Sequence, residues 1–241
     1  MPLTIAHPAI ILPVIRYSRN AAFSTGLVIG CLTPDFEYFL RAQLTSRVSH
    51  TILGQFIFCL PVGLILVLLW QAVIKRPLLQ SIPRWARQRL GSVHQSRIST
   101  LTHWMLCALG LVLGSFSHIF WDAFTHETGY FVRLMPMLSD SSWHRIPLYK
   151  VAQHASTAMG LTAISIYVFR MRPTIEIPAA SKPWQYWLII VFSCFFSYLL
   201  LWLLIPNQGL KHSIGNKIVL LHSAGLLSLL LAGLSQLRHG S

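Results

Sequence analysis

The sequence predicts an all-α integral membrane protein, a helix bundle with about five transmembrane helices and an N-terminal interfacial helical region. Only 10% of the 241 residues are charged and 54% are hydrophobic, whereas soluble globular proteins carry about 25% charged residues. The mean hydropathy is +0.58. These values exclude a disordered chain and disfavour an ordinary cytosolic enzyme, because a soluble fold needs more charge on its surface.

The expected transmembrane helices are five stretches that contain no Asp, Glu, Lys or Arg. Each is long enough to cross a bilayer, which takes about 20 apolar residues as helix. They cover residues 52–74, 104–121, 151–169, 184–206 and 218–237. The first 50 residues differ, because their apolar stretches 8–15 and 21–33 are shorter and are interrupted by proline and arginine. We expect these two stretches to lie on or dip into the membrane interface, or to pack against the bundle.

The net charge of +13 does not indicate a nucleic-acid partner. The basic residues lie in short segments between apolar runs, where cytoplasmic loops and anionic lipid headgroups account for them. The densest basic segment, 75–100, contains six of them: Lys75, Arg76, Arg84, Arg87, Arg89 and Arg97. It is therefore expected to be cytoplasmic in a cell inner (plasma) membrane protein, with the N-terminal region and the loop 126–150 outside and membrane lipids as partners.

The polar residues at the end of the second expected span form a stripe. His118, Asp122 and His126 are four residues apart, so on a helix they share one face. No Lys or Arg lies within ten residues of Asp122 on either side. A carboxylate in this position needs a cation, a distant partner or water, and a divalent metal ion would satisfy the whole stripe.

Further candidate ligands are expected on the same membrane face. His50 precedes the first span and His154 begins the third, so both are placed at the end of the bundle that carries Asp122. The N-terminal region with His7 and Asp35 lies there too. Three regions follow, namely an interfacial region at 1–51 contributing metal ligands, a three-span metal-site core at 52–170, and two further transmembrane helices at 171–241.

Imidazole and carboxylate ligands suit zinc or a similar divalent metal, and more than four of them would allow more than one ion. Such ions catalyse phosphoester hydrolysis, so the expected activity is metal-assisted hydrolysis of a phosphoester, with lipid headgroups as one substrate class. Glu37 and Glu127 are the candidate general bases, and simple solvation is their alternative. The competing class is a non-catalytic membrane protein in which the His and Asp stripe transports metal or protons or fixes helix packing.

The same residues carry a family resemblance. The order His7, Thr33-Pro34-Asp35-Phe36-Glu37, Ser49-His50-Thr51, Ser117-His118 through Asp122 to His126, and Gln153-His154 resembles the bacterial membrane proteins catalogued as domain of unknown function 4184. That family is similar to the membrane-bound metal-dependent hydrolases and, distantly, to the zinc-dependent phospholipase C and single-strand nuclease group.

The resemblance implies one to three zinc ions. Asp35, His50, His118 and Asp122 would hold the first, and His7 would join the shared carboxylate of Asp122 at a second. His126 and His154 would hold a third, although His154 is followed by Ala158 where the soluble enzymes continue His-x-x-x-Glu.

Overall fold

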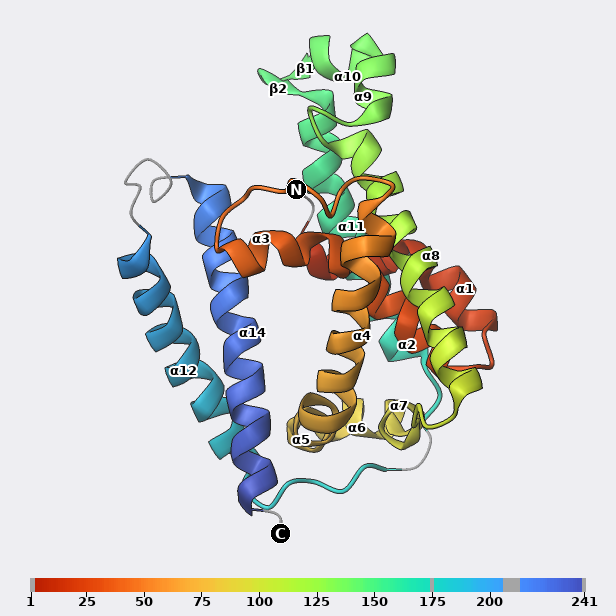
Figure 1. Ribbon diagram of the computed structural model, residues 1–241, viewed down its shortest axis with the longest axis vertical. Helices are drawn as coiled ribbons and strands as arrows, with labels where there is room; N and C mark the ends of the chain where they lie inside the picture. Colours follow the sequence, from red (N-terminus) through yellow and green to blue (C-terminus); the bar gives the residue numbers. More distant parts are fainter. Residues whose placement is uncertain (1–2, 174–175, 206–212, 240–241) are drawn as a thin grey trace. The chain divides into compact units, whose positions relative to one another are not determined.

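The fold of this chain is almost wholly helical. The computed structural model describes residues 3–173, 176–205 and 213–239 (Figure 1). Within these ranges the strands are two short ones, β1 (Ser142–Trp143) and β2 (Ile146–Pro147). The predicted all-α class is therefore confirmed.

The contacts divide the chain into two compact units, each assembled from separate stretches of sequence. The first unit contains Met1–Pro34, Val48–Leu64 and Ile98–Arg170. The second contains Asp35–Arg47, Ile65–Arg97 and Met171–Ser241. This grouping differs from the three consecutive regions expected from the sequence, because short segments near residues 35–47 and 65–97 pack with the C-terminal third of the chain.

The N-terminal segment of the first unit consists of short helices. They are η1 (Thr4–Ile11), α1 (Leu12–Tyr17), α2 (Ala21–Gly30) and the turn η2 (Thr33–Asp35). The start of α2 is capped because the Asn20 side chain accepts a hydrogen bond from the Phe23 amide at 3.0 Å. The described part of this segment thus has no helix long enough to span a membrane, as expected.

The long helix α8 (Leu101–Thr125) packs along α2 through glycines on both helices. Gly26 and Gly30 of α2 face Gly110 and Gly114 of α8, and a Cβ atom added at any of these four positions would overlap backbone atoms of the opposite helix. Each helix thus carries a G-x-x-x-G motif, which lets membrane helices approach closely. This contact brings the end of α2 against the face of α8 that carries His118.

A second long helical run extends over Gln55–Ser81. It consists of the π-helical segment η3 (Gln55–Cys59), α4 (Leu60–Leu69), the π-helical segment η4 (Trp70–Ile74) and α5 (Lys75–Ser81). Pro61 stands in the first turn of α4 and has no amide hydrogen to donate, which fits a change of helical hydrogen bonding at this point.

The loop after α8 folds into α9 (Tyr130–Leu134), α10 (Pro136–Asp140) and a tight hairpin. In the hairpin, Ser142 pairs with Pro147 and Trp143 with Ile146. The two turn residues, His144 and Arg145, have φ angles of 50° and 67°, as the two-residue hairpin turn requires. The helix α11 (Leu148–Arg170) follows and packs against η1 and α8.

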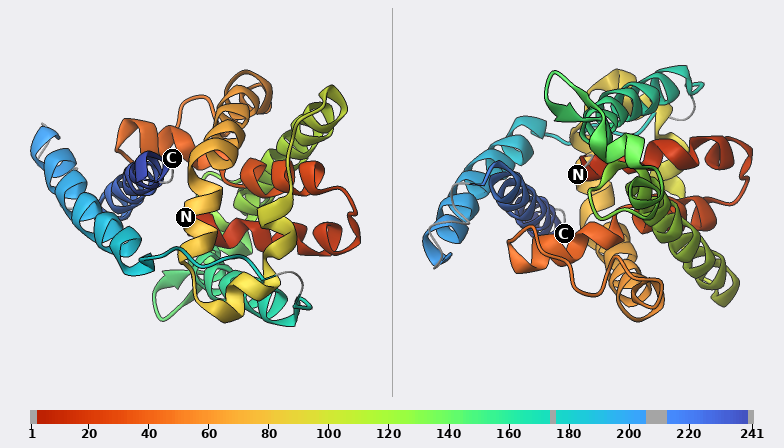
Figure 2. Two further views of the ribbon diagram at one scale, coloured as in Figure 1. Left: turned by 90° about the horizontal axis from the view of Figure 1, so that it is seen from below. Right: turned by 90° about the horizontal axis from the view of Figure 1, so that it is seen from above.

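The second unit is built around two long helices. α12 (Pro183–Leu204) and α14 (Ile214–His239) lie side by side in every view (Figure 2). The short helix α3 (Phe36–Arg41) packs on α14, where the Ser223 hydroxyl donates to the Phe39 carbonyl at 2.9 Å. The described part of this unit also contains α6 (Arg84–Arg89) and α7 (Gly91–Gln95).

Four helical segments in the described residues are long and apolar enough to cross a membrane, rather than five. They are Gln55–Ser81, Leu101–Leu134, Pro183–Leu204 and Ile214–Leu237. The expected span at 151–169 does form a helix, α11, but this helix is not among the four. The reason is its first turns, which contain Gln153, His154, Ser156 and Thr157. The fifth expected span thus forms a helix that is less apolar than the other four, and a membrane protein with several apolar helices is confirmed.

Candidate metal centre

Asp122 lies near the C-terminal end of α8 with four histidines around its carboxylate. Its side chain is only 8% exposed. The Oδ2 atom lies 3.2 Å from His118 Nε2 and 3.6 Å from His50 Nε2. The Oδ1 atom lies 3.4 Å from His126 Nδ1 and 3.6 Å from His7 Nε2. Among the described residues, every ion-pair partner of Asp122 is thus a histidine.

The orientation of His118 is set by the end of α2. Its Nδ1 atom lies 2.7 Å from the backbone carbonyl oxygen of Cys31. Since a carbonyl oxygen only accepts, Nδ1 carries the proton and donates it, and Nε2 is directed at Asp122. Metal-binding histidines are commonly oriented in this way. Cys31 was not predicted as a partner of His118, although the G-x-x-x-G motifs that position it are visible in the sequence.

His7 is buried in the first unit and stacks on His118. The two ring centroids are 3.7 Å apart and the ring planes differ by 18°. The 3-10 helix η1 that carries His7 packs against α11, and the Leu3 amide donates to the Thr157 hydroxyl of α11 at 3.1 Å. Packing against α11 thus holds the N-terminal segment at the centre.

His50 approaches Asp122 from a turn that precedes the helical run beginning at Gln55. The side-chain amide of the buried residue Gln55 donates at 2.7 Å both to the carbonyl of Ser49 and to that of Thr51. These two bonds fix the turn on both sides of His50. His50 Nδ1 lies 3.0 Å from the Ser49 hydroxyl, which leaves Nε2 toward Asp122. Gln55 is thus a positioning residue that was not predicted from the sequence.

His126 is placed differently from the other three histidines. Its Nδ1 lies 3.2 Å from the backbone carbonyl of Asp122, so this nitrogen donates a proton toward Asp122. Its Nε2 lies 3.5 Å from the side-chain amide of Gln153. Gln153 is buried whereas His154 is exposed, and the structure therefore brings Gln153, not His154, to this cluster. Neighbouring residues on a helix point about 100° apart, which is why Gln153 faces His126 and His154 does not.

The remaining predicted site residues lie as follows. Asp35 ends the turn η2, is fully buried, and is the first residue of the second unit. Its role as a ligand stays a prediction. Glu37 of α3 is buried and accepts hydrogen bonds from Arg41, Ser46 and the Arg47 amide. Glu127 is exposed directly after His126.

The geometry around Oδ2 of Asp122 fits a divalent metal ion of the zinc type. Donor atoms from His50, His118 and Asp122 all lie within 4.8 Å of one another. Two ligand atoms on one tetrahedral zinc ion, each at about 2.0–2.1 Å, are about 3.4 Å apart. The separations of 3.2 and 3.6 Å between Oδ2 and the two Nε2 atoms bracket that value. One carboxylate with two imidazoles is also a common donor set for such ions.

The cluster lies at one end of the helix pair formed by α2 and α8. Along the buried face of α8, Ser115 is the last polar side chain before Leu111 and Cys107. Gly110 and Gly114, which pack on α2, lie between these residues on the same face. In the described part of this pair, the buried face of α8 is therefore apolar from Gly114 to Cys107. The partly exposed side chains of His50 (23%) and His126 (27%) mark the side from which the cluster is reached.

Comparison with known proteins places the chain in one family. No curated protein and no solved structure matches it. One family model, described as a domain of unknown function (DUF4184), matches residues 1–234. This match covers nearly the whole chain and agrees with the resemblance carried by the histidine and aspartate motifs. The chain therefore belongs to the DUF4184 family.

Proposed function

We propose that this protein is a membrane-bound, metal-dependent hydrolase of phosphoesters. The observation that carries the proposal is the convergence of His50, His118 and Asp122 within 4.8 Å at the end of an apolar helix long enough to cross a membrane. His118 and Asp122 lie on successive turns of α8, whereas His50 comes from a separate part of the first unit. Both histidines direct Nε2 at the same carboxylate oxygen. Helix packing alone does not require such a concentration of imidazoles.

A divalent ion bound here supplies a Lewis acid that polarises a phosphoryl oxygen and activates water. His50, His118 and Asp122 would hold it. The second carboxylate oxygen of Asp122 faces His7 at 3.6 Å, which offers donors for a second ion. His126 donates its Nδ1 proton to the backbone carbonyl of Asp122, and the same nitrogen lies 3.4 Å from Oδ1, so His126 would act as a positioning residue for that carboxylate.

The same geometry favours hydrolysis over transport. An ion conduit needs polar groups that continue along the helix pair, whereas the buried face of α8 is apolar at Leu111 and Cys107. The exposed edges of His50 and His126 give the cluster an open side. Because this end of α8 lies in the C-terminal part of the apolar segment Leu101–Leu134, a phosphoester in a lipid headgroup is the substrate class that fits the location. With the basic loop cytoplasmic, this face is the outer one.

The first test is the metal content of the purified full-length protein, measured by inductively coupled plasma mass spectrometry. We expect about one or two zinc, manganese or iron ions per chain in the wild type. Asp122→Asn and His118→Ala should weaken binding by at least about tenfold, since each removes a direct ligand. Asp140→Asn and His154→Ala are matched controls, because both side chains are exposed, and they should retain the metal. Equally low metal in the wild type and in all variants would overturn the proposal.

The second test measures hydrolysis by the metal-loaded protein. The substrates are bis-p-nitrophenyl phosphate and phospholipid vesicles, each with the wild type and with the Asp122→Asn variant. We expect activity that is lost on chelation with EDTA, restored by the metal found in the first test, and absent from Asp122→Asn. A protein that holds metal but cleaves neither class would contradict the hydrolase proposal and leave only a metal-binding role.

A further inference from the structure

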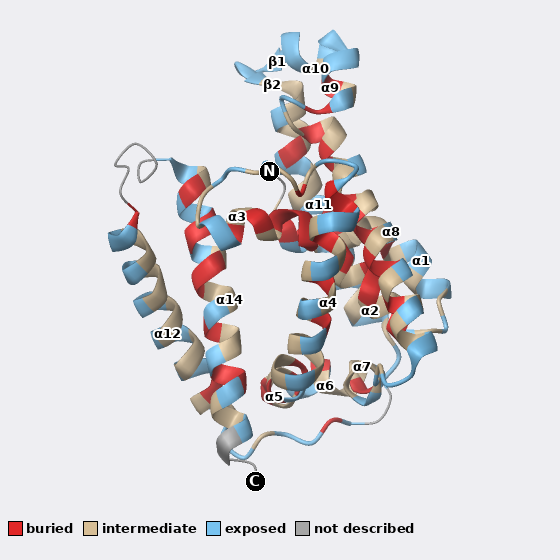
Figure 3. Ribbon diagram, in the orientation of Figure 1, coloured by how far each residue is buried: buried red, intermediate tan, exposed pale blue. Residues whose placement is uncertain are grey.

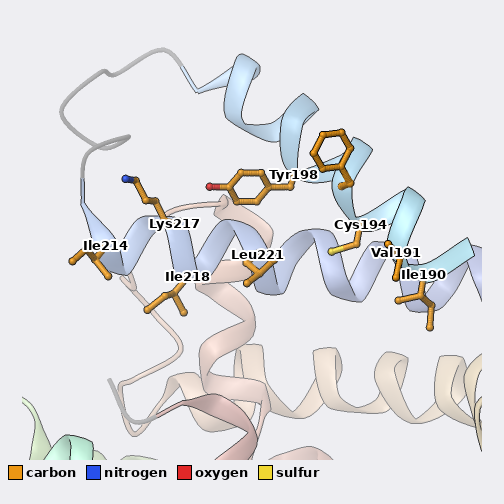
Figure 4. Close-up of a pocket in the computed structure, with 9 residues that line it drawn as sticks. Ile190, Val191, Cys194, Tyr198, Ile214, Lys217, Ile218 and Leu221 are labelled. Atoms are coloured by element: carbon orange, nitrogen blue, oxygen red, sulfur yellow. The ribbon is translucent and has the colours of Figure 1, made fainter. Parts of the chain in front are cut away.

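An open apolar groove lies between α12 and α14 of the second unit. Its volume is about 680 Å³, and the side chains that line it are drawn in Figure 4. Six aliphatic and aromatic residues supply most of its lining: Ile190, Val191 and Phe195 from α12, and Ile214, Ile218 and Leu221 from α14. Almost no polar surface interrupts these side chains, so the groove suits a hydrocarbon chain.

The aromatic residues of α12 indicate how deep the groove lies in a membrane. Trp184 and Trp202 stand 18 residues apart near the two ends of the helix, which corresponds to about 27 Å of α-helix. This matches the roughly 30 Å thickness of the hydrocarbon core, at whose borders Trp and Tyr concentrate. Tyr198 stacks on Trp202 with ring centroids 6.4 Å apart, so it lies one turn inside that border.

The groove has one polar end, and that end is cationic. Lys217 of α14 and Tyr198 of α12 both line this end, and the Tyr198 hydroxyl points toward the part of α14 that carries Lys217 (Figure 4). None of the described residues that line the groove is acidic. A lysine at the level of the border aromatics is at the depth of the lipid phosphates, and the tyrosine hydroxyl adds a hydrogen-bond donor.

We propose that this groove binds one anionic phospholipid, with its phosphate at Lys217 and Tyr198 and an acyl chain along the apolar wall. The wall from Tyr198 to Ile190 covers eight residues of α12, or about 12 Å, which accommodates a large part of one acyl chain. A second copy of this chain is the less suitable occupant, because it offers only 6 acidic residues against 19 basic ones and so little charge to match Lys217. The proposal does not depend on the metal centre.

The experiment is native mass spectrometry of the delipidated full-length protein in detergent. The probes are palmitoyl-oleoyl phosphatidylglycerol and palmitoyl-oleoyl phosphatidylcholine, added separately. Lys217→Ala removes the cation, and Cys194→Trp fills the groove, since Cys194 lines it. The matched controls are Lys182→Ala at the other end of α12 and Leu200→Trp on its exposed surface, neither of which lines the groove.

The wild type is expected to retain one phosphatidylglycerol and to bind it at least fivefold more tightly than phosphatidylcholine. Lys217→Ala should remove that preference, because one lysine near an anionic headgroup contributes about 1 kcal/mol, or about fivefold. Cys194→Trp should lose both lipids, and both controls should behave as the wild type. An unchanged preference in Lys217→Ala would overturn the proposal even if Cys194→Trp failed to fold. Retained lipid in Cys194→Trp together with a change from dimer to monomer would identify the groove as a subunit contact instead.

Discussion

Glu37 is a buried carboxylate that organises the segment after α3. It accepts hydrogen bonds from the Arg41 side chain at 3.0 Å, from the Ser46 hydroxyl at 3.0 Å and from the Arg47 amide at 2.9 Å. We expect Glu37→Gln to lower the free energy of unfolding by about 1–3 kcal/mol, because a buried charge-assisted network is broken. Thermal unfolding and elemental analysis would show lower stability with unchanged metal content.

The matched control for this substitution is Glu127→Gln, at an exposed carboxylate. Its melting temperature should equal that of the wild type. If Glu37→Gln instead kept its stability and its metal but lost hydrolysis, Glu37 would act as the general base and the structural interpretation would be wrong.

Cys31 provides a probe of the junction between α2 and α8. Burial raises the pKa of its thiol to about 12, against a smaller lowering effect of the hydrogen bond with Ser117. The thiolate is the reactive form, and with this pKa roughly one thiol in ten thousand is ionised at pH 8. We expect N-ethylmaleimide at pH 8 to leave Cys31 unmodified in the folded protein and to modify it in denaturant, as peptide mass spectrometry would show. Rapid modification without denaturant would mean that the junction opens.

The candidate site could be predicted from the sequence in part. His118, Asp122 and His126 follow helical periodicity, and His50 and His7 follow from the order of the spans. The structure brings these five residues together. The choice of Gln153 over His154 depends on the rotation of α11 about its axis, which an apolar pattern interrupted by polar residues does not fix. Gln55 bonds to the backbone carbonyl of Ser49, and His118 bonds to the backbone carbonyl of Cys31. Hydrogen bonds from a side chain to a backbone carbonyl leave no pattern in the sequence.

At the level of the helices, the glycine contact between α2 and α8 determines whether His118 is oriented. A methyl group at Gly114 would overlap the carbonyl oxygen of Leu27, and neither backbone can yield without separating the helices. We expect Gly114→Ala to cost about 1–3 kcal/mol or more in stability. It should also reduce metal content, because the Cys31 carbonyl would move away from His118. Thermal unfolding and elemental analysis measure the two effects.

Gly225 of α14 is the control for that substitution, since a Cβ atom there would meet nothing within 4 Å. Gly225→Ala should leave metal content unchanged and raise stability slightly, because alanine favours the helix by about 1 kcal/mol over glycine. A Gly114→Ala protein as stable and as metal-rich as Gly225→Ala would show that the close approach of the two helices does not matter.

The helices themselves were largely predictable from the absence of charge. Four of the five expected spans correspond to apolar helices of sufficient length. The exception, α11, has an apolar C-terminal half and a polar N-terminal half, so an uncharged stretch was a weaker criterion than mean hydropathy. The pairing of α2 with α8 was not predicted, because a G-x-x-x-G motif indicates close packing but does not identify the partner helix.

For the whole molecule, the order of the spans determines on which side of the membrane each loop lies. The loop 82–100 joins two apolar spans, Gln55–Ser81 and Leu101–Leu134, and its arginines favour the cytoplasm. We expect the segment around Ser139 to be outside. In right-side-out vesicles, an impermeant maleimide should label Ser139→Cys but label Ser92→Cys only after lysis; both positions are exposed. The reverse pattern would place the histidine cluster on the cytoplasmic side.

The grouping of the chain into two units had no counterpart in the sequence. Residues 35–47 and 65–97 interrupt the first unit and belong to the second. Contacts of this kind depend on single side chains, such as Asn216 accepting a hydrogen bond from the Leu44 amide at 2.7 Å. Hydropathy locates helices along the chain but carries no information about which distant segments they will meet.

The positions of the clustered histidines also have a consequence for biosynthesis. The first two, His7 and His50, leave the ribosome well before His118 and Asp122. At about 5–20 residues per second, the 68 residues between His50 and His118 take roughly 3–14 seconds to translate. During that interval two imidazoles are present without the aspartate that they will face. The cluster can therefore form only after α8 has been inserted, late in the synthesis of the first unit.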